Sequence, residues 1–134
     1  MKFEEIHVGQ SASRTVTVDG DLVSRFSEVS GDTNPVHLDE GYAKQTIFQG
    51  RIAHGMLSGA LISAVLANDL PGNGTIYLSQ SFRFLKPVRL GDSLTATVTV
   101  TSLDQKKRFI ELTTECFVQD GSKVVSGVAL TKLL

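Results

Sequence analysis

The stretch GMLSGALISAVLANDL, residues 55–70, decides the fold of this chain. Its apolar side chains fall on nearly every face of a helix, and a helix that is apolar all round is buried. Pro71-Gly72-Asn73-Gly74 follows the stretch and ends the helix. Because the stretch is too short to span a bilayer, we expect a buried helix inside a globular domain.

The segments on both sides of this helix are predicted to be strands. Their apolar residues alternate with polar ones, which is typical of half-buried strands. One strand is predicted before the helix, at Arg14–Val18, and four are predicted after it, at residues 75–88, 93–103, 108–119 and 123–133. The long strands must bury their apolar faces against the helix. We therefore predict an α+β fold, an antiparallel β-sheet wrapped around a long central α-helix, with residues 93–103 or 123–133 as a free edge.

Two short helices are predicted between the first strand and the long helix. Asp19-Gly20-Asp21 offers N-cap residues, and Leu22, Phe26 and Val29 follow at helical spacing up to Gly31. Residues 40–46 form the second predicted helix.

Composition limits the classes of protein to which the chain can belong. The chain has 134 residues, 41% hydrophobic and 20% charged, so we expect one globular domain spanning residues 1–134. A net charge of −1 gives no general attraction to nucleic acid or to an anionic membrane. Cys116 is the one cysteine, so no intrachain disulfide forms, and we expect an inert packed thiol. The first ten residues contain no apolar run of signal-peptide length, and we expect a cytoplasmic location, or an organelle lumen after removal of a leader.

One rigid turn brings together a carboxylate, an amide and an imidazole. Asp32, Asn34 and His37 lie within six residues around Pro35, which fixes its own φ and makes Asn34 extended. One interpretation is structural: Asp32 and Asn34 cap local amides, and His37 is a half-buried spacer. The other is catalytic, because a stiff loop can hold a carboxylate and an imidazole in fixed geometry for proton transfer. A metal site formed by Asp32, His37 and Asp39 has little support, since no further His or Cys lies nearby at ligand spacing.

The same turn lies within a longer motif. FSEVSGDTNPVHLDEGYA (residues 26–43) resembles the hydratase-2 motif of the (R)-specific enoyl-CoA hydratases, in the MaoC-like dehydratase family. AHGMLSGALIS (residues 53–63) and LPGNGTIYLSQSFRFLKPVRLGD (residues 70–92) are similar to later parts of that family. The resemblance implies a hot dog fold, a homodimer, and reversible syn addition of water to trans-2-enoyl-CoA. The product would be (3R)-3-hydroxyacyl-CoA in fatty acid or polyhydroxyalkanoate metabolism, and no cofactor or metal is expected.

The resemblance assigns roles residue by residue. Asp32 and His37 match the catalytic pair, and which of them is the acid and which the base stays open. The backbone N–H of Gly55 matches the oxyanion donor, although a glycine there also permits close packing at a helix start. Asn34 is expected to hold the loop. Ser63 is expected to support the loop or the water, with an ordinary intrahelical hydrogen bond as the equal alternative.

Further residues are assigned to the substrate or to packing. Leu66 and Leu130 are predicted to shape the acyl pocket, and His54 is expected to cap or pack at the helix start. Four cationic residues are candidates for contacts to coenzyme A phosphates or to an acyl carrier protein: Arg51, Arg83, Lys86 and Arg89.

Three other functions are compatible with such a fold. A 3-hydroxyacyl-[acyl carrier protein] dehydratase would use the same residues in the reverse direction. A hot dog thioesterase is disfavoured because residues 55–67 of the long helix contain no Asp or Glu. A non-catalytic acyl-thioester binding subunit is disfavoured by the intact Asp32 and His37 pair.

Overall fold

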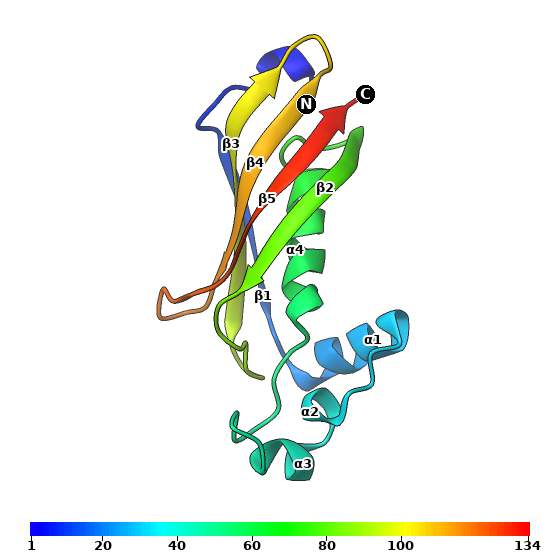
Figure 1. Cartoon of the computed structure of the whole chain (residues 1–134), viewed down its shortest axis with the longest axis vertical. Helices are drawn as coiled ribbons and strands as arrows, with labels where there is room; N and C mark the ends of the chain where they lie inside the picture. The colour runs from blue at the N-terminus through cyan, green and yellow to red at the C-terminus, as the bar shows by residue number, and fades with distance from the viewer.

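The computed structural model describes residues 1–134, and Figure 1 shows the order of its elements. A short 3₁₀ helix at Phe3–Glu5 comes first. The remaining elements are β1 (Ser11–Thr17), α1 (Gly20–Ser30), α2 (Pro35–Leu38), α3 (Glu40–Lys44), α4 (Gly55–Asn68), β2 (Thr75–Phe84), β3 (Ser93–Asp104), β4 (Phe109–Phe117) and β5 (Lys123–Leu133).

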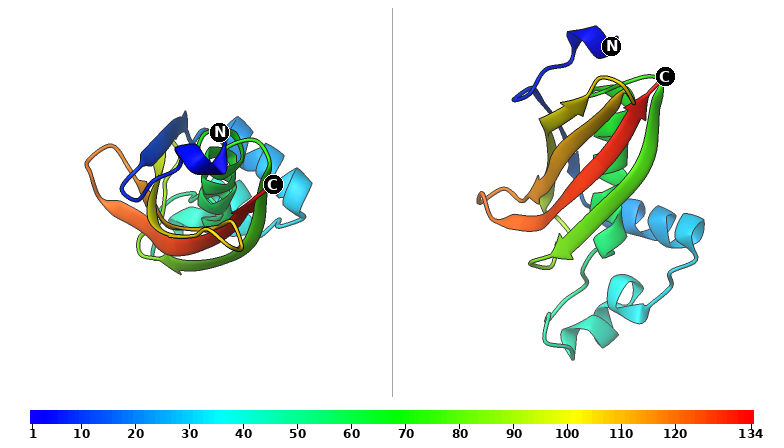
Figure 2. Two further views of the ribbon diagram at one scale, coloured as in Figure 1. Left: turned by 90° about the horizontal axis from the view of Figure 1, so that it is seen from above. Right: turned by 45° about the horizontal axis from the view of Figure 1, so that its top comes forward.

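The five strands form one antiparallel sheet that wraps around α4. The strand order is β1-β3-β4-β5-β2, and every neighbouring pair is antiparallel. Seen from above, the sheet curls around the helix as a partly closed layer (Figure 2). The predicted α+β architecture is therefore confirmed, with the predicted strand at residues 75–88 ending four residues earlier, at Phe84.

The predicted sheet edges are wrong. β3 pairs with both β1 and β4, and β5 pairs with both β4 and β2, so neither is a free edge. The edges are β1 and β2, the two strands that flank the helical segment in the sequence. The lengths of the strands did not identify the edges. A strand lies at an edge when only one other strand pairs with it, and that pairing joins segments far apart in the sequence.

The core lies between α4 and the concave face of the sheet. The buried residues of the helix are Leu57, Ser58, Gly59, Ile62, Val65 and Leu66. They pack against buried positions that alternate along β3 and β4, as expected for strands with one face in the core. None of the helices combines the length and apolar character that crossing a membrane requires.

One side of α4 is not covered. Met56, Ala60 and Ala67 share this side and are exposed, Met56 to 53%. The expectation of a helix buried all round is therefore wrong for this side, because five strands curl around only part of the helix surface.

The segment between β1 and α4 forms a separate helical layer at one end of the sheet (Figure 1). Asp19 caps α1 by accepting a hydrogen bond from the Leu22 N–H, and Gly31 ends it with a φ of 76°. Both were predicted. The short helix α2 was not predicted, and it forms because Pro35 suits a first helical position and Asn34 caps it.

Candidate active site

Local hydrogen bonds shape the loop that carries Asp32. The Asp32 N–H donates to Ser30 Oγ at 3.1 Å, and Asp32 Oδ1 accepts from the Asn34 N–H at 3.2 Å. Asn34 Oδ1 in turn accepts from the Val36 N–H at 3.3 Å. The predicted capping by Asp32 and Asn34 is therefore confirmed. It does not exclude chemistry, because the Asp32 side chain is exposed and only Oδ1 takes part in the capping.

The ring of His37 is held in one tautomer. His37 is 8% exposed, and its Nδ1 lies 2.8 Å from the carbonyl oxygen of Ile52. A carbonyl can only accept, so Nδ1 carries the proton and Nε2 keeps its lone pair in the neutral ring. Nε2 is therefore the His37 atom that can take up a proton.

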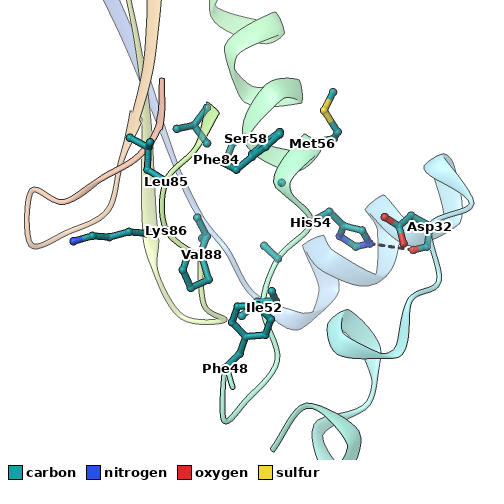
Figure 3. A pocket seen from close by; sticks show the side chains of 14 residues that line it. Asp32, Phe48, Ile52, His54, Met56, Ser58, Phe84, Leu85, Lys86 and Val88 are labelled. Atoms are coloured by element: carbon teal, nitrogen blue, oxygen red, sulfur yellow. Dashed lines mark hydrogen bonds between the residues drawn. The ribbon is translucent and has the colours of Figure 1, made fainter. Parts of the chain in front are cut away.

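His54 joins this pair, although it lies far from them in the sequence. Its ring stacks on that of His37 with centroids 3.9 Å apart and planes 27° apart. Its Nε2 lies 2.9 Å from Ser27 Oγ and 3.0 Å from the Asp32 carbonyl oxygen, the contact drawn as a dashed line in Figure 3. His54 is the N-cap residue of α4, but its side chain makes no capping hydrogen bond. Of the two expected roles, capping or packing, packing is therefore the one observed.

The electrostatic environment of His54 favours the neutral ring. Its side chain is 3% exposed, and its Nδ1 is buried without a hydrogen-bond partner. This burial lowers the pKa of His54 below its ordinary value, and the neighbouring His37 acts in the same direction.

Asp32, His37 and His54 converge on one place. One carboxylate oxygen of Asp32 and one ring nitrogen of each histidine lie within 4.8 Å of one another. A water that makes two hydrogen bonds of about 2.8 Å joins atoms up to about 5 Å apart, so this spacing suits a bridging water. Asp39 is not in the cluster, since its carboxylate caps α3 by accepting from the Tyr42 N–H.

A cavity of about 520 Å³ opens beside the cluster (Figure 3). It lies between the start of α4 and the end of β2, and its lining is mostly apolar. Residues that line it include Asp32, His54, Gly55, Met56, Phe84 and Lys86.

Gly55 combines the two roles considered for it. It is exposed and is the first residue of α4, where a backbone N–H has no intrahelical acceptor and lies at the positive end of the helix dipole. A Cβ at this position would lie 2.8 Å from the Phe84 ring, so the close packing is real as well. The same glycine therefore admits the aromatic ring and places a helix-start backbone N–H without an intrahelical acceptor at the cavity wall.

Ser63, Leu66 and Leu130 lie away from the cluster. Ser63 is eight residues beyond Gly55 on α4, about 12 Å along the axis, and lines a second, apolar cavity of about 440 Å³ against β2. Leu66 is 1% exposed within the hydrophobic core, and Leu130 is partly buried on β5. Neither leucine lines either of these two cavities.

The four cationic candidates fall in more than one place: Lys86 and Arg89 line a small cavity together, and Arg83 lies apart from them. Lys86 lines the first cavity, whereas Arg83 lines a different one with Glu115. Arg51 donates to the His37 carbonyl at 2.8 Å, and Arg89 donates to the Phe48 carbonyl. Lys86 is therefore the cation best placed for an anionic part of a ligand in the first cavity.

Sequence reasoning missed the partnership between His54 and Ser27. The two residues are 27 positions apart, and nothing in their local sequence marks them as partners. The one available signal was a histidine directly before a helix start, and that signal predicted a cap.

Known proteins resemble this chain over most of its length. The MaoC like domain family matches residues 3–120. The (R)-specific enoyl-CoA hydratase of Rhodospirillum rubrum is 51% identical over 127 residues, covering 95% of this chain and 88% of that protein. The 3-hydroxybutyryl-CoA dehydratase of Methylorubrum extorquens is 41% identical over 131 residues, covering 98% of this chain and 83% of that protein. The solved (R)-hydratase from Aeromonas caviae involved in PHA biosynthesis is 43% identical, with a TM-score of 0.95 over 98% of this chain and 99% of that one.

Proposed function

The chain belongs to the MaoC-like domain family, and we propose on that premise that it is an (R)-specific enoyl-CoA hydratase. Its fold is the hot dog fold, and its class is hydro-lyase. The proposed reaction is reversible syn addition of water to trans-2-enoyl-CoA, giving (3R)-3-hydroxyacyl-CoA. The observation that carries the proposal is the convergence of Asp32 and His37 beside the cavity that Gly55 lines.

Asp32 and His37 move the protons in this proposal. The hydroxyl of one water bonds to C3 of the enoyl group, and a proton from that water reaches C2 through the pair. Both groups have an atom with a free lone pair, the second carboxylate oxygen of Asp32 and Nε2 of His37. A positioned acid–base group contributes about 10²–10⁴-fold to the rate. The assignment is to the pair, and either member can be the first to take the proton.

Gly55 stabilises the enolate that forms during the reaction. Negative charge develops on the thioester oxygen when water adds to C3. An N–H without an acceptor at the positive end of a helix is the donor that such an oxygen needs. Asn34 and Arg51 hold the surrounding backbone through Val36 and His37, and Ser63 is too distant to bind the same water.

We propose coenzyme A as the carrier. Lys86 lines the first cavity and can meet a phosphate, and the M. extorquens relative is named for a CoA substrate. An acyl carrier protein is favoured by a broad cationic surface, and two of the four candidate cations, Arg51 and Arg89, are engaged by backbone carbonyls. A 3-hydroxyacyl-[acyl carrier protein] dehydratase remains the alternative. The proposal also includes a single domain over residues 1–134 and a cytoplasmic location. We propose a role in fatty acid or polyhydroxyalkanoate metabolism, because the A. caviae hydratase is described as involved in PHA biosynthesis.

We also propose a homodimer formed through β2 and the uncovered side of α4. β2 is a sheet edge, and its exposed apolar residues continue those of the helix. They are Ile76, Tyr77, Leu78 and Phe84. The other edge, β1, consists mainly of Ser and Thr and presents little apolar surface. A second copy would cover the apolar edge, and the molar mass in solution tests this.

The test of function is hydration of crotonyl-CoA, followed by the loss of enoyl-thioester absorbance. We expect rapid loss and a (3R)-3-hydroxybutyryl-CoA product, identified with a stereospecific 3-hydroxyacyl-CoA dehydrogenase. Longer enoyl-CoA substrates and the matching carrier-protein thioester are compared in the same assay. A folded protein that turns over none of them contradicts the proposal, and a preference for the carrier-protein thioester favours the dehydratase alternative.

A further inference from the structure

We infer that His54 is a positioning residue for the proposed hydration and acts through Asp32 and His37. The inference rests on the proposed function and adds to it a residue outside the acid–base pair. The His54 side chain contacts both members, through a hydrogen bond to the Asp32 backbone and a stack on the His37 ring.

The hydrogen bond determines the tautomer of His54. The Asp32 carbonyl oxygen can only accept, so Nε2 of His54 carries the proton and donates it. Ser27 Oγ lies 2.9 Å from the same nitrogen and anchors it to α1. The loop residue that bears the carboxylate is therefore tied by its own carbonyl to the start of α4. Since Gly55 is the next residue, the same contact sets the distance from the carboxylate to the proposed oxyanion donor.

The stack fixes the second member of the pair. His37 is held in its ring plane by the Ile52 carbonyl, and the His54 ring covers one face of it. Phe26 packs against His54 with centroids 4.9 Å apart, so the His54 ring cannot easily turn away. The positions of the Asp32 carboxylate and the His37 imidazole therefore both depend on the buried His54 ring.

Packing alone does not account for a histidine at this position. Its Nδ1 is buried without a partner, and a buried polar atom without a hydrogen bond costs stability. A phenylalanine would fill the same space and stack on His37 without that cost. The group that only histidine supplies here is the Nε2–H donor to Asp32, and this donor is the feature to test.

The experiment compares three variants of the full chain in the crotonyl-CoA assay. His54→Phe keeps the ring and removes the donor. His54→Gln places an amide N–H about as far from Cβ as Nε2 is. His54→Asn is polar but too short to reach the Asp32 carbonyl. Thr131→Val is the control, because it removes a buried hydrogen bond from β5 to the Ile110 carbonyl, and neither residue lines the first cavity.

We expect His54→Phe and His54→Asn to lower kcat about 10²-fold, the loss that a displacement of about 1 Å causes, with little change in KM. His54→Gln should recover kcat to within about 10-fold of the wild type. Thr131→Val should lower the thermal midpoint without changing kcat per folded molecule. If His54→Phe does not fold, the comparison of His54→Gln with His54→Asn answers the same question.

A double variant tests whether His54 acts through Asp32. In Asp32→Asn, the further change His54→Phe should lower kcat by much less than it does in the wild type. Full additivity of the two losses overturns the inference, as does an unchanged kcat in both His54→Phe and His54→Asn. An inactive wild type overturns the proposed function instead, so the two failures are distinguishable.

Discussion

The two ends of α4 differ in composition and in neighbours. The first half contains Gly55 and Gly59, and the polar residues buried around it are Ser27, His37, His54 and Ser58. The second half buries only apolar side chains: Ile62, Val65 and Leu66, followed by Leu70 just beyond the helix. The first half of α4 therefore combines buried polar groups with glycines that lie close to aromatic rings, and the second half packs into the hydrophobic core.

The difference shows how one helix serves two purposes. A site needs exposed backbone N–H groups and fixed polar side chains, and both reduce the apolar burial available for stability. The far end supplies that burial. We therefore expect substitutions near Gly55 to change activity more than stability, and substitutions near Leu66 to do the reverse. Four predictions test this division, in decreasing order of expected effect.

Removing either member of the acid–base pair should have the largest effect. We expect Asp32→Asn and His37→Gln each to lower kcat at least about 10²-fold, because each removes a group that transfers a proton. The thermal midpoint should change little, since both replacements keep polar side chains of similar size. Crotonyl-CoA kinetics and thermal unfolding of the same preparations provide the comparison, and full activity in either variant would show that the turn is structural.

Leu66→Ala should give the opposite result. The residue is 1% exposed, and truncating a buried leucine costs about 2–5 kcal/mol. We expect a lower free energy of unfolding in urea and an unchanged kcat per folded molecule. The same variant tests the predicted acyl role of Leu66. Faster turnover of longer enoyl-CoA chains would show that the acyl pocket reaches the second half of α4. That result would contradict the proposed separation of activity and stability between the two halves of the helix.

Gly55→Ala and Gly59→Ala form a matched pair on one helix. The added Cβ would lie 2.8 Å from the Phe84 ring in the first case and 2.9 Å from the Phe82 ring in the second. Overpacking of this kind costs about 1–3 kcal/mol, so both variants should lose similar stability. Only Gly55→Ala should also lower kcat, because relief of its clash with Phe84 displaces the backbone N–H that is the proposed oxyanion donor. Adding Phe84→Leu should relieve the clash, and equal kcat losses in the two alanine variants would contradict the assignment of Gly55.

Acidification should lower the stability of the folded protein through protonation of His54. This is the smallest of the four expected effects. Burial lowers the pKa of His54 in the folded protein below its value of 6.5 in the unfolded chain. The unfolded state therefore binds the proton first, so stability is fully present above pH 6.5 and is lost as the pH falls through the folded pKa. We expect the urea midpoint to fall more between pH 8 and pH 5 in the wild type than in His54→Gln. Identical falls would show that His54 does not contribute.

The local elements of the fold were predictable because neighbouring residues determine them. Asp19 and Gly31 set the ends of α1 through capping and a left-handed φ. The short range of the hydrogen bonds around Asp32 and Asn34 made the loop predictable as well. The single buried helix followed by four strands indicated what the sheet encloses.

Long-range pairing was decided only in the tertiary structure. The sheet order, which makes β1 and β2 the edges, depends on pairings such as Ser11 with Thr99, far apart in the sequence. The contact between Ser27 and His54 has the same origin, as does the separation of Arg83 from Lys86 and Arg89. A turn or a cap is specified by the few residues within it, whereas such contacts depend on how distant faces pack together. The sequence by itself therefore determined most of the elements and the loop that carries Asp32 and His37, and only packing brought His54 into contact with both residues.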